Sequence, residues 1–600
     1  MSENKKNIWV AGITRGHNAG VCLLKDGEIV FSIEEERLTR QKYDGGPLAT
    51  MLKILDYTPK LDYLVIAHTT PKETAGKIDF TGDDMYTGFA RKLGLIDRKA
   101  DKWKHPQVID LSHIHHKLHA ACAFYRSGFE EAVSVIVDGA GTFLELDFQG
   151  EKLTGWETES IFDCAYPANF TTLYKHIGIR EPKPGAIIKN FSGDRYNEKT
   201  THEARIGDYA GIVKVYEAVT EYCGFSAIEA GKTMGLFPYG KLNNNIPPLF
   251  DTTGTHPNSN RNLVIPRYPN GAIINHSLYG FLDEHNSNDL SELENRRDLA
   301  YACQTQTQEQ VLQLIFKAVE MSEKNNVVLS GGYGLNCVAN YFYLDKLKEK
   351  GINLYVEPIS NDAGTAMGAA MMIYRSAVND STITKFKDNL YLGLHKTYTD
   401  DDIELTCALF DNAEFINATH KDVVDLLRNK NIVAVFQGRS ENGPRALGNR
   451  SILFDPTVLD GKDFVNSVKH REYFRPFAGT ILKEHAHDWF DLRGMEESPS
   501  MMYAVNCQPG IAEKIPSIIH VDGTCRIQTV TAEQNKYFYD LISEFYKESG
   551  VPILFNTSFN LGGDPLVETL EDALDTLARS EIEYLYLPEN KKLIRILNQE

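Results

Sequence analysis

Apolar runs near the start of the chain predict a β-rich segment. Residues 7–13 form a run typical of a buried strand, and residues 21–33 hold two such runs joined by Asp26 and Gly27. Aspartate followed by glycine between apolar runs is the strongest short-range signal for a β-hairpin. The arrangement returns at residues 132–156, where strand-like runs alternate with glycine-containing turns. Two such meanders predict a duplicated α/β domain.

Further along the chain the apolar pattern becomes that of a mixed α/β protein. Residues 352–358 are typical of a strand, and residues 362–377 are typical of a helix whose small side chains allow close packing. Residues 378–402 are polar, as expected at a boundary between domains. We therefore expect a first domain at 1–395 and a second at 396–600.

The second domain also shows an α/β pattern. The apolar runs at 431–438 and 551–558 are typical of buried strands. Residues 569–580 are amphipathic and open with a threonine followed by acidic residues, which predicts a capped helix.

Composition and charge narrow the classes of function. A chain of 600 residues exceeds one ordinary domain, and its formal net charge of −19 argues against a protein that grips nucleic acid through bulk charge. No apolar stretch approaches the length of a membrane span. The nine cysteines include no CxxC pair, which favours reduced thiols. We therefore expect a cytoplasmic protein without a membrane segment.

The histidines of the segment HHKLHA are the first candidates for chemistry. His115 and His119 lie four residues apart, so on a helix they share one face, as do histidine pairs that bind a metal ion. Asp138 ends an apolar run and Asp362 precedes a predicted helix. Ordinary polar histidines and turn-forming or capping aspartates remain the alternative interpretation.

Positively charged residues gather in the second domain. The segment GRSENGPRALGNRSI contains three arginines among glycines and a proline, and such side chains either bind phosphate or cover a solvated loop. Lys469 and Arg471 are two residues apart, so on a strand they would point to the same side and could bind one polyanion. Ser558 and Asn560 could add neutral hydrogen bonds.

Several motifs in register resemble one known family. The first part of the chain contains GHNAGVCLL, EEERLTR, HHKLHAACAF, VDGAG, KTMGLFPYG, LSGGYGLN and DAGTAMGAA. The second part contains GRSENGPRALGNRSI, KHREYFRPFA, VDGTCRIQTV and LFNTSFN. Together they resemble the carbamoyltransferase family of nodulation and antibiotic-tailoring enzymes over most of the chain.

The resemblance implies two kinds of domain. The first would be a duplicated actin-like (ASKHA) domain similar to the threonylcarbamoyl-transfer protein Kae, and the second an α/β domain similar to the YrdC carbamoyl-adenylate synthases. The family metal is usually iron(II), although the ligand types equally suit zinc or manganese. Carried over to this chain, the metal ligands would be His115, His119, Asp138 and Asp362.

The resemblance also implies which residues bind the reactants. His17 matches a position at the acceptor site and is the candidate general base, with a plain turn histidine as the alternative. Adenylate would lie against Gly139, Gly331, Gly332 and Asn336. ATP and carbamoyl phosphate would be bound by Arg439, Arg445, Arg450, Lys469, Arg471, His520, Arg526, Asn556, Ser558 and Asn560, with Lys469 and Arg471 also catalytic.

The activity implied by the resemblance is ATP-dependent O-carbamoyl transfer. Carbamoyl phosphate would yield carbamate, which attacks the α-phosphorus of ATP to give carbamoyl-adenylate and pyrophosphate. An acceptor hydroxyl then takes the carbamoyl group, and AMP leaves. Because both substrates are anionic, Mg²⁺ would normally help the protein cations to compensate their charge.

The acceptor is expected to be a small molecule such as a sugar, an antibiotic or a nucleotide. The alternative is 5-hydroxymethylcytosine in DNA, because cations outnumber acids in residues 91–104 and 165–208, the latter including Lys175. Solvated surface is the other interpretation of these stretches.

Two further functions and an open oligomeric state complete the expectations. The chain could threonylcarbamoylate tRNA or bind nucleotides without catalysis, since a fold does not fix a function. Pyrophosphate release that depends on carbamoyl phosphate would separate transfer from mere binding. A homodimer is compatible with the sequence.

Overall fold

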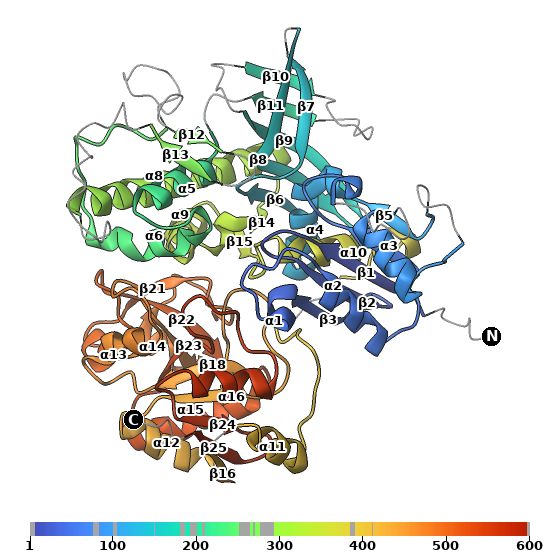
Figure 1. Cartoon of the computed structure of the whole chain (residues 1–600). Helices are drawn as coiled ribbons and strands as arrows, with labels where there is room; N and C mark the ends of the chain where they lie inside the picture. Colours follow the sequence, from blue (N-terminus) through green and yellow to red (C-terminus); the bar gives the residue numbers. More distant parts are fainter. Residues whose placement is uncertain are drawn as a thin grey trace. The chain divides into compact units, whose positions relative to one another are not determined.

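The computed structural model divides the chain into two compact units. Figure 1 shows its helices and strands, coloured from the N-terminus (blue) to the C-terminus (red). One unit contains Met1–Val30 and Gly45–Phe386, and the other contains Phe31–Asp44 and Lys387–Glu600. The assignment of functional domains to 1–395 and 396–600 stays a prediction. The structure describes residues 7–75, 83–99, 105–148, 150–179, 186–191, 201–206, 210–250, 264–267, 271–275, 293–383, 390–410 and 412–596.

The first sheet has five strands. Their order is β3 (Glu28–Glu34), β2 (Gly20–Lys25), β1 (Trp9–Thr14), β4 (Tyr63–Ile66) and β5 (Val108–Asp110). Strand β1 is antiparallel to β2 and parallel to β4, which is parallel to β5. The turn between β2 and β3 has positive φ at Asp26 (51°) and Gly27 (87°), so the predicted hairpin is confirmed.

The second sheet repeats this order around a different set of strands. Its path is β10 (Ala186–Phe191), β11 (Thr201–Ile206), β9 (Asn169–Ile179), β8 (Glu151–Ala165), β6 (Glu131–Val137), β14 (Asn326–Ser330) and β15 (Asn353–Val356), with β7 (Phe143–Phe148) paired to β8. Strand β6 is antiparallel to β8 and parallel to β14, which is parallel to β15. The series β8-β6-β14-β15 therefore matches β2-β1-β4-β5 in order and direction, as the two predicted meanders required.

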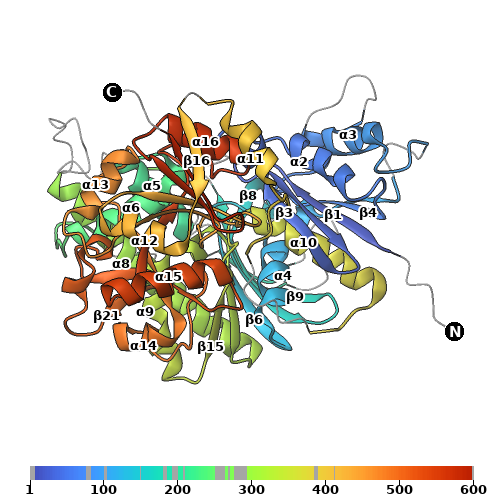
Figure 2. The same ribbon diagram turned by 90° about the horizontal axis from the view of Figure 1, so that it is seen from below.

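Two helices pack closely at the centre of this unit. Helix α4 (His115–Ser127) lies beside α10 (Ala363–Val378) in both views (Figures 1 and 2). A Cβ atom on Gly368 would lie 2.0 Å from the carbonyl oxygen of Leu118, so only glycine permits this approach. The remaining elements are α2 (Leu48–Leu52), α3 (Met85–Leu93), α5 (Ile212–Tyr222), α6 (Ala230–Leu236), α8 (Glu294–Ser322), α9 (Cys337–Lys348), β12 (Val264–Pro266) and β13 (Ala272–Ile274).

The other unit is built on a ten-stranded sheet. The order is β16 (Ala413–Asn417), β25 (Lys592–Ile596), β24 (Tyr584–Leu587), β17 (Val433–Phe436), β18 (Arg450–Phe454), β23 (Ile553–Ser558), β19 (Ala478–Leu482), β22 (Thr524–Val530), β21 (Ala504–Cys507) and β20 (Phe490–Asp491). Its helices are α11 (Asp400–Cys407), α12 (His420–Arg428), α13 (Gly461–Val468), α14 (Ala486–Trp489), α15 (Lys536–Ser549) and α16 (Leu570–Ala578). Thr569 and Asp572 form a capping box at α16, which confirms the predicted helix start.

A short segment from early in the chain belongs to this same unit. Helix α1 (Glu35–Thr39) carries Arg37, whose guanidinium donates to the backbone oxygens of Glu441 and Gly443, each at 3.1 Å. Arg40 donates to the backbone oxygen of Leu566 at 2.7 Å. The two arginines of the motif EEERLTR therefore attach this segment to the second unit. The apolar pattern of the sequence does not indicate to which unit the segment belongs. Within the described chain, the helices lack the combination of length and apolar character that a bilayer crossing requires.

Candidate functional site

Four predicted metal ligands converge in the first unit. His115 and His119 lie one turn apart on α4, Asp138 follows β6, and Asp362 immediately precedes α10. One candidate ligand atom from each of these residues lies within 4.8 Å of the others. The Nε2 atoms of His115 and His119 are both 3.5 Å from Oδ1 of Asp362.

These separations suit a cation held between the four side chains. Ligand atoms about 2.1 Å from a metal at the centre of a tetrahedron lie about 3.4 Å from one another. The side chains of His115 and His119 are completely buried, and apart from the contacts with the carboxylates of this cluster their ring nitrogens have no hydrogen-bond partner among the described residues. Buried imidazoles without partners are costly unless something else binds them. The residues present therefore fit a bound metal ion.

The electrostatics of the cluster keep its carboxylates ionised. Burial opposes the charge of Asp362, but His115 and His119 outweigh it and hold the pKa of this carboxyl well below its ordinary range. Burial likewise opposes a charge on His115, yet Asp362 and Asp138 leave its pKa raised. Two carboxylates and two imidazoles accommodate iron(II), zinc or manganese, so the ligand set alone does not select one metal.

Backbone contacts hold the ligands in place. Asp138 Oδ1 accepts a hydrogen bond from the backbone N–H of Gly332 at 3.0 Å, which leaves Oδ2 facing His115 at 3.8 Å. The backbone N–H of His115 donates to Thr142 Oγ1 at 3.0 Å. The first bond ties the ligand cluster to the glycine-rich turn that was predicted to bind adenylate.

A buried polar network lies beside the ligand helix and corrects one expectation. Lys175, counted among the cations of a basic surface stretch, is 5% exposed and donates to Glu157 at 2.6 Å. Glu157 in turn accepts from the backbone N–H of Thr142 at 3.0 Å. His116 places Nδ1 2.8 Å from Ser160 Oγ, and burial lowers its pKa to about 4. Lys175 is therefore an internal support and not a surface cation.

Most of the remaining basic stretches lie outside the described residues or side chains. Arg91, Lys92, Arg98 and Lys99 are described: Arg91 forms an ion pair with Asp83 at 3.3 Å, and Arg98 donates to the backbone oxygen of Lys92 at 3.3 Å. The expectation of an anion-binding face stays a prediction for Lys102, Lys104, Arg180, Lys183, Lys189, Arg195, Lys199 and Arg205.

The glycine-rich turns are close to the ligand cluster. Gly331 has φ of 87°, and a Cβ atom there would lie 2.4 Å from the backbone oxygen of Val137. A Cβ on Gly139 would lie 2.7 Å from Glu217 Oε1. Asn336 does not fit the expected role in adenylate binding, because its side chain caps α9 and exchanges hydrogen bonds with Gln304 at 2.9 and 3.2 Å.

Replacing Gly331 with alanine is expected to destabilise the first unit. Both Gly331 and Gly351 have positive φ, but only Gly331 would press a Cβ against backbone, because Gly351 has open space around it. We expect Gly331→Ala to lower the free energy of unfolding by about 1–3 kcal/mol more than Gly351→Ala. Denaturant unfolding of both variants tests this, and equal losses would contradict the assigned geometry.

The second unit gathers cations around Lys469. This side chain is 2% exposed, and its Nζ donates to the backbone oxygen of Ser558, with Ser558 Oγ and Asn560 Oδ1 each 3.4 Å away. Burial, followed by the charges of Arg471 and Arg475, holds the pKa of Lys469 well below its ordinary range. The pKa of Arg471 is also held well below its ordinary value, first by burial and then by the charges of Arg475 and Arg526.

Strand register explains how distant parts of the chain meet in this cluster. Ala478 of β19 pairs with Asn556 of β23 on one side and with Arg526 of β22 on the other. Paired positions point to the same face of a sheet, and Ser558 shares that face with Asn556 because they are two residues apart. Within the described chain, no carboxylate forms an ion pair with Lys469, Arg471 or Arg526, so the cluster suits a polyanion.

Lys469 and Arg471 do not lie on a strand, contrary to the expectation from their spacing. Lys469 is the C-cap residue of α13, and His470 has a left-handed φ of 52°. This turn, and not strand alternation, places the two cations beside each other. Arg475 was missed by sequence reasoning, although it lies in the same motif; it pairs with Glu472 at 3.6 Å.

Two predicted phosphate-binding arginines hold the backbone. Arg450 is 2% exposed, and its guanidinium donates to four carbonyl oxygens, including those of Gln437 at 2.6 Å and Glu568 at 3.1 Å. Arg439 donates to the backbone oxygens of Gly393 and Leu392 at 2.7 and 2.8 Å. These bonds engage the two terminal nitrogens of Arg450, and Nε and one terminal nitrogen of Arg439. The structure therefore gives both arginines a role in backbone support, and phosphate binding by either residue stays a prediction.

The other predicted residues lie around the cluster. Arg445 is half-buried and close enough for its charge to act on Arg471. The amide of Asn556 donates to Thr480 Oγ1 at 2.9 Å and to the backbone oxygen of Ala446 at 3.2 Å, which fixes the loop that carries Arg445. His520 is 7% exposed, in the turn before β22.

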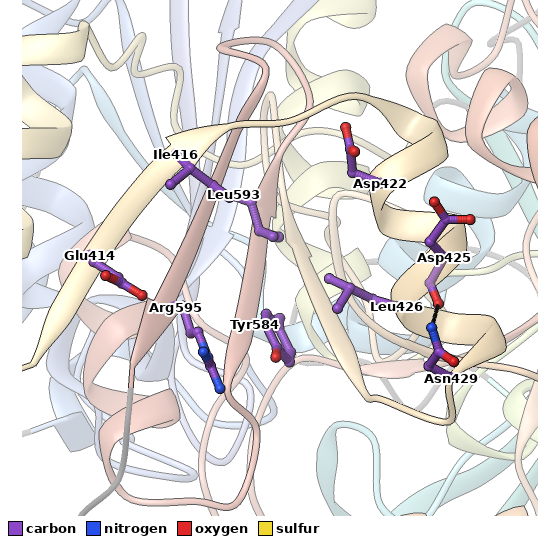
Figure 3. A pocket seen from close by; sticks show the side chains of 9 residues that line it. All are labelled: Glu414, Ile416, Asp422, Asp425, Leu426, Asn429, Tyr584, Leu593 and Arg595. Atoms are coloured by element: carbon purple, nitrogen blue, oxygen red, sulfur yellow. Dashed lines mark hydrogen bonds between the residues drawn. The ribbon is translucent and has the colours of Figure 1, made fainter.

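A pocket of about 340 Å³ lies elsewhere on this unit (Figure 3). It is formed by α12 and by β16, β25 and β24, at the edge of the sheet away from the strands that carry Asn556 and Arg526. Asp422 in its wall is engaged in the cap of α12, and Asn429 donates to the backbone oxygen of Asp425 at 2.8 Å. The pocket therefore does not contain the predicted substrate-binding residues.

His17 belongs to the surroundings of the metal-ligand cluster. It is half-buried in the turn after β1 and lies within electrostatic range of Asp362. This position is compatible with contact to a reactant bound at the cluster.

Comparisons with known proteins agree with the two-part organisation. Sequence profiles for the carbamoyltransferase N-terminus and C-terminus match residues 61–371 and 424–593. An uncharacterized protein of Synechocystis sp. is 30% identical, covering 95% of this chain and 94% of its own. Nodulation protein NolNO of Sinorhizobium fredii is 28% identical, covering 95% and 78%. The 3'-hydroxymethylcephem-O-carbamoyltransferase of Streptomyces clavuligerus is 33% identical, covering 42% and 46%.

Solved structures add little to this assignment. The crystal structure of T. kodakarensis HypF aligns with 62% of this chain and 48% of its own at 13% identity. Its TM-score of 0.34 is too low to support a conclusion about fold or function. The profile matches and the similarity to the Synechocystis protein, which extends over nearly the full length of both chains, are sufficient. The chain belongs to the carbamoyltransferase family and is an enzyme of carbamoyltransferase type.

Proposed function

We propose that this enzyme is an ATP-dependent O-carbamoyltransferase whose two half-reactions belong to its two units. The first unit would be an actin-like, Kae-like transfer domain with a metal, and the second a YrdC-like carbamoyl-adenylate synthase. The observation that carries the proposal is the convergence of His115, His119, Asp138 and Asp362, with both imidazoles buried and lacking other partners.

The first half-reaction would use the cation cluster of the second unit. Water cleaves the carbamoyl–phosphate bond and releases phosphate and carbamate. A carbamate oxygen then bonds to the α-phosphorus of ATP while the bond to pyrophosphate breaks. Lys469, Arg471 and Arg526 stabilise the negative charge on these groups, and Arg475 joins them because its charge acts on both Lys469 and Arg471. Mg²⁺ would accompany ATP.

The second half-reaction would use the first unit. The acceptor hydroxyl oxygen bonds to the carbamoyl carbon, the bond from that carbon to AMP breaks, and His17 takes the hydroxyl proton. The bound cation, which we propose to be iron(II) with zinc or manganese as alternatives, would supply Lewis acidity. Gly331 and Gly332 allow the adenylate to approach the backbone without a side chain in the way.

The test uses labelled carbamoyl phosphate, ATP and the full-length enzyme. We expect pyrophosphate release to require carbamoyl phosphate, and an acceptor to gain one carbamoyl group with AMP as the second product. The matched control replaces carbamoyl phosphate with inorganic phosphate. A carbamoylated acceptor formed equally well without ATP would contradict the adenylate route, and absence of any carbamoyl-phosphate-dependent pyrophosphate would contradict the first half-reaction.

A further inference from the structure

A second group of polar side chains lies beside the metal-ligand cluster, at the carboxyl ends of parallel strands. Arg15 and His17 follow β1, and His68 follows β4, which runs parallel to β1 (Figure 2). A Cβ atom on Gly16 would lie 3.7 Å from Cε1 of His68, so these two loops are adjacent. Ligands of open α/β sheets bind at such strand ends.

The group is close to the proposed site of transfer. His68 lies within electrostatic range of His115 and Asp362, both proposed metal ligands, and of Arg15 and His17. Burial, followed by the charge of Arg15, lowers the pKa of His68 to about 3, so its imidazole is neutral. Arg15 is therefore the fixed positive charge of the group.

Several polar atoms in this group have no partner. Nδ1 of His68, Nε of Arg15 and the hydroxyl of Tyr86 are buried and make no hydrogen bond in the described part of the chain. Tyr86, on α3, is completely buried, and its hydroxyl is within range of the charge of Arg15. Buried polar atoms without partners require an explanation, and a ligand supplies one.

Nearby acids do not neutralise Arg15. Among the residues that the structure describes, its guanidinium donates only to hydroxyls, those of Thr70 at 2.7 Å and Thr74 at 2.8 Å. Asp84 is paired with Lys72 at 2.9 Å, and Asp83 is paired with Arg91 at 3.3 Å. Asp110 accepts from the backbone N–H groups of Lys72 and Ser112 at 2.8 and 2.9 Å.

We propose that Arg15, with His68 and Tyr86, binds an anionic group of the acceptor, a phosphate or a carboxylate. The acceptor is then a small hydroxyl compound that carries this group, such as a sugar phosphate, a uronic acid or a nucleotide. The planar guanidinium of Arg15 donates hydrogen bonds to the anion, and His17 accepts the proton of the acceptor hydroxyl. This inference rests on the proposed transfer function and specifies its substrate class.

The experiment compares matched probes that differ only in the anionic group. Glucose, glucose 6-phosphate and glucuronic acid form one series, and 5-hydroxymethyldeoxycytidine and its 5′-monophosphate form the other. Dissociation constants are measured by equilibrium dialysis with the full-length enzyme and with Arg15→Gln, Arg15→Lys and Lys25→Gln. Lys25 is an exposed cation at the opposite end of the same sheet, so it serves as the matched control.

We expect at least one anionic probe to bind about 10- to 100-fold more tightly than its neutral counterpart. Arg15→Gln should abolish this preference, Arg15→Lys should retain part of it, and Lys25→Gln should leave it unchanged. The phosphate and carboxylate arms identify which anion is preferred.

Three results would overturn the inference: no preference for any anionic probe, a preference that Arg15→Gln leaves intact, or carbamoyl transfer to hydroxymethylated DNA but not to the mononucleotide. Carbamoyl-phosphate-dependent pyrophosphate release is measured in parallel. Its retention in Arg15→Gln shows that the first half-reaction persists whichever way the probes behave. Its absence from the unmodified enzyme would instead refute the proposed function.

Discussion

Replacing His119 with alanine is expected to abolish carbamoyl transfer to the acceptor while leaving carbamoyl-phosphate-dependent pyrophosphate release intact. The substitution removes one of four converging ligand groups in the first unit. Loss even of groups that merely support metal ligands lowers affinity or activity about 10- to 100-fold, so loss of a ligand should exceed this range. The cation cluster of the second unit contains no residue of α4 and should continue to form the adenylate.

The measurement follows pyrophosphate and the carbamoylated product in the same reaction, with metal content determined on the same sample. Lys117→Ala is the matched control, because Lys117 lies on the same helix but is not among the four ligands. Equal loss of both half-reactions in His119→Ala, with the fold retained in its circular dichroism spectrum, would show that the two reactions do not divide as proposed.

Replacing Lys469 with methionine is expected to reduce pyrophosphate release at least about 1000-fold without destabilising the protein. The ammonium group is buried next to Arg471 and Arg475, and this environment holds its pKa well below the ordinary value. A lysine whose pKa is lowered on folding favours the unfolded, protonated chain at neutral pH. Methionine removes that cost and fills a similar volume, so the melting temperature should stay constant or rise.

Lys462→Met on the same helix is the control for loss of a charge. Lys469→Arg should be as inactive as Lys469→Met although it keeps the positive charge. A planar guanidinium cannot reproduce the contacts of Nζ with Ser558 and Asn560. Full activity of Lys469→Met would remove this residue from the reaction. Lost activity together with a large fall in melting temperature would instead indicate a structural role.

Patterns local in the sequence predicted much of the fold. The Asp26-Gly27 hairpin, the capped helix at Leu570–Ala578 and the spacing of His115 and His119 all depend on neighbours within a few residues. Pairing of the two aspartates with those histidines could not be derived from such patterns. It depends on sheet order and on glycine contacts that bring α4 against α10.

The residues whose contacts could not be predicted from the sequence are those whose partners lie far away in the chain. Arg450 looks like a phosphate ligand in its motif, but it binds the backbone oxygen of Glu568. Lys175 looks like surface charge until β8 and β9 pair and place it on Glu157. Charge alone does not distinguish a cation that binds substrate from one that satisfies buried carbonyls or carboxylates.

The central claim is that one cation is held between α4, the end of β6 and the start of α10. Anomalous diffraction from crystals of the full-length enzyme, purified anaerobically with iron(II), tests it most directly. The account predicts one strong peak within about 2.3 Å of a side-chain atom of each of His115, His119, Asp138 and Asp362. A metal-loaded, active enzyme with no anomalous peak among these four side chains would contradict it.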